Sequence, residues 1–582
     1  MKIQPLFKQH VMGHKLRYAI GAALLSMSCL LLLVIPQLLR HFTDGLQTLT
    51  LTGKDIMTMA LGIVAIGLLT AFFRSVGRIQ LFGLAREQER KLRNDLFAKW
   101  EGLSSEYFNR QRIGDLMAHA VNDINVMREV STMGVFMTIE ATVLIGVALV
   151  AMAGTIHIGL TLLVLLPLPA LTYLAYRFRY HIQERTTHVQ EAIGQLTSRV
   201  QEFCAGIRVV KAYAQEKSEL KKFEEDSCHN REMNDQLIRS NSSFSSLSQV
   251  IVGVSYLLSV VFGGILVLRG DISLGDFVAF NTYLTMLIMP VENLGKVINT
   301  FQRGRAVDIR LRHILSTEPA VSDDDDVEPV AGGIRGKLEF RNLSFRYPDQ
   351  QQLTLRDITL TVPQGSSLAI VGKVGSGKTT LVQLLLRLYN PPQGTIFIDD
   401  REIGSIPLQQ LRESIGFVPQ EHMLFSTTIG NNIAFHPHGY TSEQIEEAAK
   451  VAQVHDNIIA FPGKFDTSLG ERGVSLSGGQ RQRVSMARAL IKKPSILVFD
   501  DSLSAVDAET EEHILNGLKA VMKGRTTIIT SHRLSAIRHA DQIIVMDQGR
   551  IVEQGNHQSL IRLGGIYASI YDMQTMNREM GG

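Results

Sequence analysis

The most informative part of this chain is Leu476-Ser-Gly-Gly-Gln480, which is followed by Arg-Gln-Arg. A glycine-rich turn that opens a helix, here expected over residues 481–490, presents backbone N–H groups and a helix N-terminus to an anion, usually phosphate. A second anion-binding turn lies upstream, in Gly372-Lys-Val-Gly-Ser-Gly-Lys378-Thr379. It matches the P-loop pattern G-x-x-x-x-G-K-[ST] at every position. Two such turns in one domain indicate that each completes a nucleotide site on a partner copy.

The sequence around the P-loop predicts the strand–loop–helix context that the motif requires, with a strand at 367–371 and a helix at 380–388. Backbone amides of the loop are expected to wrap the phosphates. The Lys378 ammonium would reach the β and γ oxygens, and the Thr379 hydroxyl would ligate Mg²⁺. The residues predicted to bind the nucleotide here are Gly372, Gly375, Ser376, Gly377, Lys378, Thr379 and Thr380.

A buried strand is predicted at Ile496-Leu-Val-Phe-Asp500, because this run is apolar and ends in a carboxylate. Asp500 is the expected second protein ligand of Mg²⁺. The predicted cofactors are therefore ATP and Mg²⁺.

Long apolar segments are concentrated before residue 300, and six of them are long enough to span a bilayer. They are expected at about residues 16–39, 56–76, 135–153, 158–176, 250–268 and 277–297. Basic residues are concentrated in the two long stretches between spans two and three and between spans four and five. By the positive-inside tendency, these stretches, both termini and the ATP-binding half are predicted to be cytosolic. The chain is thus expected to be an integral membrane protein.

The remaining composition is unremarkable for such a protein. A formal net charge of +3 does not indicate a nucleic-acid partner. Three cysteines without metal-like spacing are expected to be reduced structural thiols. The acidic run at 323–326 is expected to be a solvated linker. The predicted organisation is a transmembrane domain over 1–318, a linker over 319–335 and a nucleotide-binding domain over 336–577.

The P-loop and the Leu-Ser-Gly-Gly-Gln turn, in this order, resemble the nucleotide-binding domain of ABC transporters. Together with the six spans, they are similar to an exporter-type half-transporter, which implies a helical transmembrane domain fused to an α/β P-loop NTPase domain of ABC type. The stretches 114–123 and 206–216 resemble the cytosolic coupling loops of such proteins. The resemblance implies that the chain works as a dimer, with ATP between the P-loop of one chain and the turn of the other, formed here by Ser477, Gly478, Gly479 and Gln480.

Further site residues follow from the same resemblance. Tyr347 matches the aromatic residue that stacks on adenine, and Gln420 matches a glutamine that touches Mg²⁺. His532 matches the histidine that contacts the γ-phosphate and the attacking water, and Asp507 matches a loop that crosses the dimer interface. Asp501 stands where a glutamate normally polarises the attacking water. The implied catalytic residues are therefore Asp501, His532 and Gln420.

Asp501 is one methylene shorter than glutamate, so this chain's own P-loop site is expected to hydrolyse ATP slowly. This degeneracy resembles one member of the heterodimeric bacterial multidrug exporters, which implies that the membrane is a bacterial inner membrane. The partner is therefore expected to be an unlike half-transporter with a glutamate at this position, and a homodimer is the alternative.

The expected substrate is an amphipathic or drug-like compound, or a lipid, exported from the cytosol or the inner leaflet. Glu292 lies in the sixth predicted span, where a carboxylate is costly and often functional. It is the candidate contact for cationic substrates, and the alternative is a carboxylate paired with a neighbouring helix. Glu140, in the third predicted span, is expected to be structural. The alternatives are uptake of a metal–siderophore complex, a dedicated lipid flippase and a regulator or channel that transports nothing. A soluble ATPase acting on DNA or ribosomes carries the same turn, but the six spans argue against it.

Overall fold

The computed structural model describes residues 5–323, 327–435, 439–470, 476–501, 521–531 and 537–580. The chain forms two compact units. Unit 1 consists of Met1–Glu101 and Ile113–Thr317, and unit 2 consists of Gly102–Arg112 and Glu318–Gly582.

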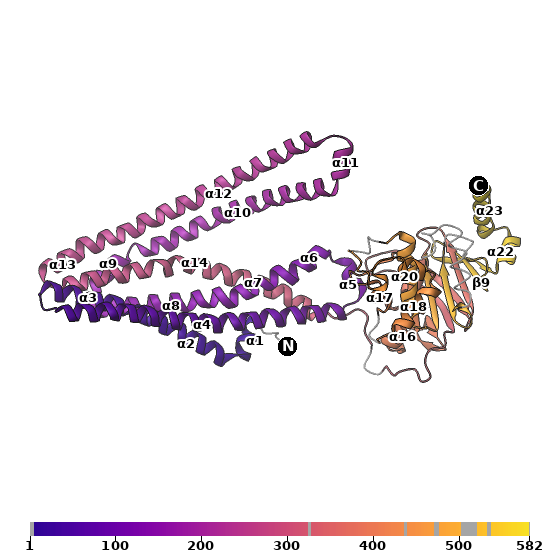
Figure 1. Cartoon of the computed structure of the whole chain (residues 1–582), viewed down its shortest axis with the longest axis horizontal. Coiled ribbons are helices and arrows are strands. Elements are labelled where there is room, and N and C mark those ends of the chain that lie inside the picture. Colours follow the sequence, from indigo (N-terminus) through magenta and orange to yellow (C-terminus); the bar gives the residue numbers. More distant parts are fainter. Residues whose placement is uncertain are drawn as a thin grey trace. The chain divides into compact units, whose positions relative to one another are not determined.

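The described part of unit 1 contains helices and their connections, and no strands. Its N-terminal helices are α1 (Leu6–Gly13), α2 (Lys15–Leu32), α3 (Ile35–Gln47) and α4 (Gly53–Gly102). One continuous helical stretch then contains α6 (Ile113–Ala118), η1 (His119–Asp123), α7 (Ile124–Glu129), η2 (Val130–Gly134), α8 (Val135–Ala151) and η3 (Met152–Ile156). The rest of the unit contains α9 (Ile158–Leu165), α10 (Leu168–Ala205), α11 (Ile207–Ala212), α12 (Glu216–Leu258), η4 (Ser259–Gly263), α13 (Gly264–Arg269) and α14 (Leu274–Ser316). Helices α10 and α12 run side by side, and α11 joins their ends (Figure 1).

Five stretches of the described residues are long and apolar enough to cross a membrane. They are Lys15–Gln47, Gly53–Gly102, Ile113–Ile156, Glu216–Arg269 and Leu274–Ser316. Each overlaps one of the predicted spans. The predicted span at 158–176 is not one continuous helix, because the helix is interrupted at Pro167, between α9 and α10. Proline lacks a backbone N–H and cannot continue a helix without disturbing the preceding turn. Helices α9 and α10 therefore take the place of that span.

The first basic stretch contributes a helix to unit 2, and this was not predicted. Helix α5 (Ser105–Arg110) belongs to unit 2, in which the Asn109 amide donates to the Tyr389 hydroxyl at 2.7 Å. Arg110 makes two hydrogen bonds to the Asp349 carboxylate, at 2.9 and 2.7 Å. The proposed coupling stretches 114–123 and 206–216 both lie in unit 1. In the first basic stretch, the segment that forms hydrogen bonds within unit 2 is therefore α5, which precedes the predicted coupling stretch at 114–123.

Unit 2 contains two β-sheets. The four-stranded sheet has the order β2 (Leu355–Val362), β1 (Leu338–Phe345), β4 (Ile396–Ile398) and β5 (Arg401–Glu402). The six-stranded sheet has the order β10 (Arg550–Gly555), β9 (Gln542–Asp547), β3 (Ser367–Gly372), β8 (Thr526–Thr530), β7 (Ile496–Asp500) and β6 (Ile415–Val418). All its pairings are parallel except that of β9 with β10. The strand predicted at 496–500 is confirmed at these bounds.

Helices cover the larger sheet. They include α15 (Lys378–Leu385), α16 (Leu408–Ser414), α17 (Ile429–Ile433), α18 (Ser442–Val451), α19 (His455–Ile459), α20 (Gly478–Leu490), α22 (His557–Leu563) and α23 (Ile566–Met580), with short 3₁₀ turns at Ile403–Ser405 and Lys464–Asp466. Alternate residues of β3 enter two cores: Leu368 and Ile370 pack toward the smaller sheet, and Ala369 and Val371 pack toward α18 and α20. Both faces of the strand are therefore buried, which explains its continuous apolar run.

Candidate functional site

The candidate site lies at one edge of the six-stranded sheet. The parallel strands β3, β7 and β8 end at Gly372, Asp500 and Thr530, and β6 ends shortly before Gln420. Carboxyl ends of parallel strands meet at the same edge, where ligands of open α/β sheets bind. A cavity of about 590 Å³ opens there. It is lined by Gln350, Gln352, Leu353, Thr354, Arg356, Val374, Gly375, Ser376, Gly377, Lys378, Thr379, Thr380, Gln420, Asp500, Asp501, Thr530, Gln548 and Gly549.

Two P-loop glycines are required by close backbone approaches. A Cβ on Gly372 would lie 2.2 Å from the carbonyl oxygen of Met546. Gly377 has a φ of +101°, and a Cβ on it would lie 2.7 Å from Leu355 Cδ2. Only glycine tolerates both the left-handed backbone and the crowding. The loop is therefore held against β9 and β2 while its free edge faces the cavity.

Lys378 is buried at the first turn of α15. Its Nζ donates to the carbonyl oxygens of Gly372 at 2.8 Å and Lys373 at 3.0 Å. Burial lowers the pKa of the ammonium, and the charges of Asp501 and Asp500 oppose this shift. The predicted phosphate ligand thus lies in the loop, bonded to backbone carbonyls and close to two carboxylates.

Asp500 is held by hydroxyl groups from two neighbouring elements. The Thr530 hydroxyl donates to Asp500 Oδ1 at 2.6 Å, and the Thr379 hydroxyl lies 3.4 Å from the same oxygen. Asp500 is buried. The two residues predicted to ligate Mg²⁺, together with Gln420 on the cavity wall, therefore offer the oxygen donors that this hard cation prefers.

The cavity also fits a phosphate group. Ser376 lines the cavity and is buried, yet its Oγ has no hydrogen-bond partner among the described residues. Such a hydroxyl is costly to leave unsatisfied. A phosphate oxygen in the P-loop would satisfy it, so the residues present fit both ATP and Mg²⁺.

Asp501, the residue after Asp500, is held in position by hydrogen bonds of its backbone N–H. Its N–H donates to the Thr530 carbonyl oxygen at 3.0 Å and lies 2.9 Å from the Thr530 hydroxyl. Its φ of +44° is in the left-handed region, which aspartate tolerates better than most residues. The end of β8 therefore sets the position of this residue in the cavity wall.

The structure does not place Tyr347 in the cavity wall. Its hydroxyl donates to Gln383 Oε1 at 2.9 Å and lies 3.0 Å from Thr380 Oγ1, and its ring packs edge-on against Tyr389 at 5.0 Å. Burial raises the pKa of the phenol. In this arrangement the ring belongs to an aromatic cluster beside α15, and stacking on adenine remains a proposal.

The Leu-Ser-Gly-Gly-Gln turn lies at the start of α20, apart from the cavity lining. The Ser477 hydroxyl accepts from the Gln480 N–H at 3.3 Å, and the Gln480 side chain accepts from the Ser477 N–H at 2.9 Å. This reciprocal capping box satisfies two otherwise free N–H groups of the helix. The turn is thus separate from the P-loop within the chain, and its binding of a phosphate stays a prediction.

Two predicted site residues, His532 and Asp507, lie outside the described residues. The sequence did not predict the cavity residues from 350–356 or the pair Gln548 and Gly549. These come from the turn between β1 and β2, from Arg356 at the start of β2, and from the turn between β9 and β10. Neither turn carries a phosphate-binding motif, and only the strand order brings them beside the P-loop.

Comparison with known proteins identifies the family. The model described as "ABC transporter transmembrane region" matches residues 18–291, and the one described as "ABC transporter" matches residues 355–504. The probable multidrug resistance ABC transporter ATP-binding/permease protein YheI of Bacillus subtilis is 37% identical over 569 residues, which cover 97% of each chain. The chain belongs to the ABC transporter family.

Two further relatives and one solved structure are also similar to this ABC transporter. The multidrug resistance-like ATP-binding protein MdlA of Escherichia coli is 35% identical, covering 97% of this chain and 95% of its own. The ATP-dependent lipid A-core flippase of Syntrophus aciditrophicus is 35% identical, covering 84% and 81%. A bacterial Atm1-family ABC exporter solved with ATP bound has a TM-score of 0.81 and 29% identity, covering 96% of this chain and 99% of that chain. This ABC transporter is an integral membrane exporter whose ATP-binding domain couples ATP hydrolysis to transport.

A first prediction concerns the hydroxyl that holds Asp500. We expect Thr530→Val to weaken Mg²⁺·ATP binding about tenfold, because the substitution keeps the shape and removes a hydrogen bond to a charged group. Binding of ATP without Mg²⁺ should change little. Isothermal titration with and without Mg²⁺ measures both. Thr527→Val, at another buried threonine of β8, is the matched control. Equal losses in the two variants would contradict the proposed role of Thr530.

Proposed function

We propose that this chain is the slow-hydrolysing half of a heterodimeric exporter of amphipathic compounds. In this proposal it lies in a bacterial inner membrane, with both termini and the ATPase domain in the cytosol. The observation that carries it is Asp501, an aspartate in the cavity wall beside Asp500 and Lys378.

The backbone geometry supports a slow site. Glutamate would extend the carboxylate by one carbon–carbon bond, about 1.5 Å. The hydrogen bonds from Asp501 N–H to Thr530 oppose a forward shift of the main chain that could compensate for the shorter side chain. Because a misplacement of about 1 Å can cost on the order of a hundredfold in rate, we propose that ATP is retained at this site.

The remaining groups of the P-loop site are in place. Lys378, Thr379 and Asp500 line one cavity. ATP bound there, with Mg²⁺ on Thr379, Asp500 and Gln420, would supply negative charge to the partner's helix N-terminus. In turn, this chain's Ser477–Gln480 turn, at a helix N-terminus, would receive the phosphate charge of the ATP bound to the partner's P-loop. His532 would contact the γ-phosphate and Asp507 would lie at the interface.

The partner is proposed to be a different half-transporter with glutamate at the equivalent position. Affinity purification of the tagged chain from its native membranes, followed by mass spectrometry, tests this. The expected product contains this chain and one unlike half-transporter in equal amounts. Recovery of this chain as a homodimer only would contradict the proposal.

The proposed substrate class is amphipathic and drug-like. Relatives with 37% and 35% identity are described as multidrug resistance proteins. Lipid is the second candidate, because a relative with 35% identity is described as a lipid A-core flippase. Substrate-stimulated ATPase measurements on the complex in lipid, combined with vesicle flux of each hit, separate the two. Stimulation by lipid A alone, with no flux of drug-like compounds, would favour the second.

The two intramembrane carboxylates differ in their surroundings. Glu140 on α8 forms an ion pair with Arg74 on α4, which supports the structural role expected for it. Glu292 on α14 is exposed and has no ion pair among the described residues. An intramembrane carboxylate of this kind suits the recognition of a cation.

We therefore expect Glu292→Gln to lower the transport of cationic amphipathic dyes about tenfold, which corresponds to the loss of about 1.4 kcal/mol of attraction. Transport of neutral dyes should remain within about twofold. Flux of a matched cationic and neutral pair into inverted vesicles measures the selectivity. An equal loss for both dyes would show that Glu292 has no charge-specific role.

A further inference from the structure

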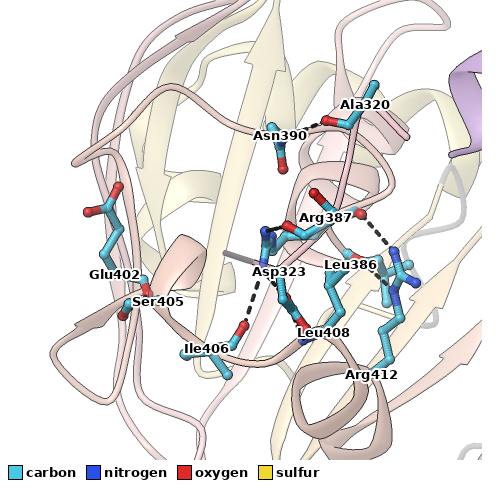
Figure 2. A network of polar contacts seen from close by, with 11 residues as sticks. Ala320, Asp323, Leu386, Arg387, Asn390, Glu402, Ser405, Ile406, Leu408 and Arg412 are labelled. Atoms are coloured by element: carbon cyan, nitrogen blue, oxygen red, sulfur yellow. Dashed lines mark hydrogen bonds and ion pairs between the residues drawn. The ribbon is translucent and has the colours of Figure 1, made fainter. Parts of the chain in front are cut away.

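The segment that follows the last helix of unit 1 is bonded tightly into unit 2. Helix α14 ends at Ser316, and the carbonyl oxygen of Ala320 already accepts a hydrogen bond from the Asn390 side chain at 2.8 Å. Asp323 accepts the Leu408 N–H with both carboxylate oxygens, at 3.0 and 2.9 Å (Figure 2). The acidic run was expected to be a solvated linker; Asp323 is exposed to solvent, and its carboxylate also accepts these two hydrogen bonds.

A buried arginine completes this attachment. Arg387 is only 4% exposed. Its guanidinium donates to Asp323 Oδ1 at 3.3 Å, to the Ser322 carbonyl oxygen at 3.1 Å and to the Ile406 carbonyl oxygen at 3.1 Å. A buried cation is tolerated only when it is paired and hydrogen-bonded. The segment from Ala320 to Asp323, which we call the clamp segment, supplies two of these three acceptors.

The clamp segment thereby binds two helices of unit 2. Arg387 directly follows the C-cap of α15, and Leu408 is the first residue of α16. Arg412 of α16 donates to the carbonyl oxygens of Leu386 at 3.3 Å and Arg387 at 2.8 Å. The end of α15, the start of α16 and the clamp segment therefore form one hydrogen-bonded group (Figure 2).

Both helices lead directly to the ATP cavity. Helix α15 begins with Lys378 and Thr379, and α16 continues into β6, which is followed by Gln420. All three of these residues line the cavity. Only residues 317–319 separate the end of α14 from the clamp segment. Because this connection is short, a displacement of the end of α14 would also displace the clamp segment and the two helices bonded to it, α15 and α16.

We propose that Asp323 is a positioning residue that couples the end of α14 to the P-loop helix and to Gln420 through Arg387 and α16. When the Asp323 side chain is removed, ATP still binds, but its binding no longer changes the conformation of the last turns of α14. This inference rests on ATP hydrolysis coupled to transport and does not depend on Asp501, on the partner's identity or on the substrate.

Hydrogen–deuterium exchange of the full-length protein in lipid nanodiscs, with and without Mg²⁺·ATP, tests the coupling. In the wild type we expect ATP to change exchange both in the P-loop and in the last turns of α14, at residues 303–316. In Asp323→Ala the P-loop change should persist, and the change at 303–316 should fall about tenfold. Exchange at the Leu408 amide should rise about tenfold without ATP, because this N–H loses its charged acceptor.

Asp323→Asn keeps the shape and one acceptor oxygen, so it should fold and lie between the wild type and the alanine variant. Glu318→Ala removes an exposed carboxylate from the same linker and should behave like the wild type. Three results would overturn the proposal: no change at 303–316 in the wild type, persistence of that change in both Asp323 variants, or simultaneous loss of the P-loop change. The last result would indicate a structural role in the nucleotide site itself.

Discussion

We expect Lys378→Met to weaken ATP binding to this chain at least about a hundredfold. The ammonium is buried in the P-loop, and in the structure it is bonded to the carbonyl oxygens of Gly372 and Lys373. It can exchange these for phosphate oxygens with little movement. A charge-assisted hydrogen bond contributes about 1.5–3 kcal/mol, and the loss of two such bonds exceeds the 2.8 kcal/mol or so that correspond to a hundredfold change.

The matched control is Lys373→Ala. Lys373 carries the same charge in the same loop, but its side chain is exposed, and only its backbone carbonyl contacts Lys378. We expect its ATP affinity to stay within about threefold of the wild type, because a surface charge contributes little. Equilibrium binding of a fluorescent ATP analogue to both variants measures the difference. Similar losses at Lys373 and Lys378 would show that net charge, and not a specific phosphate contact, governs binding.

Much of the nucleotide domain could be predicted from the sequence, because short motifs there have direct structural consequences. The run Ile496–Phe499 is apolar throughout because both faces of a central parallel strand are buried, and the structure gives a strand over Ile496–Asp500, as predicted. The P-loop glycines imply close backbone approaches, and Gly372 and Gly377 make them. Local sequence was sufficient to predict these segments, because their own residues determine their conformation.

The rest depends on contacts between distant segments. Nothing near Asp323 in the sequence indicates the hydrogen bonds that its carboxylate makes, because its partners Arg387 and Leu408 are far away in the sequence. The cavity residues Gln548 and Gly549 reach the P-loop only through the order of the strands. Tyr347 was expected to stack on adenine, but its ring packs on Tyr389. The surroundings of these residues depend on how distant segments pack in the folded domain, and no sequence motif indicates them.

The second large effect is expected at Asp501. Asp501→Glu should raise the ATP turnover of the purified chain about 10- to 100-fold, because the longer side chain moves the carboxylate by about 1.5 Å toward the cavity. The main chain at this position is held by Thr530, so the added length is not absorbed by the backbone. Asp501→Asn has the same length as the wild type and lacks the base. It should bind ATP normally and hydrolyse it no faster than the wild type.

The most direct measurement is steady-state ATP turnover per chain, at saturating Mg²⁺·ATP in lipid, for the wild type and Asp501→Glu purified without any partner. A slow-hydrolysing subunit should give weak activity in the wild type and a rise of about 10- to 100-fold in the variant. Full, drug-stimulated turnover by the wild-type homodimer, unchanged or lowered in Asp501→Glu, would contradict the proposed slow site and the need for an unlike partner.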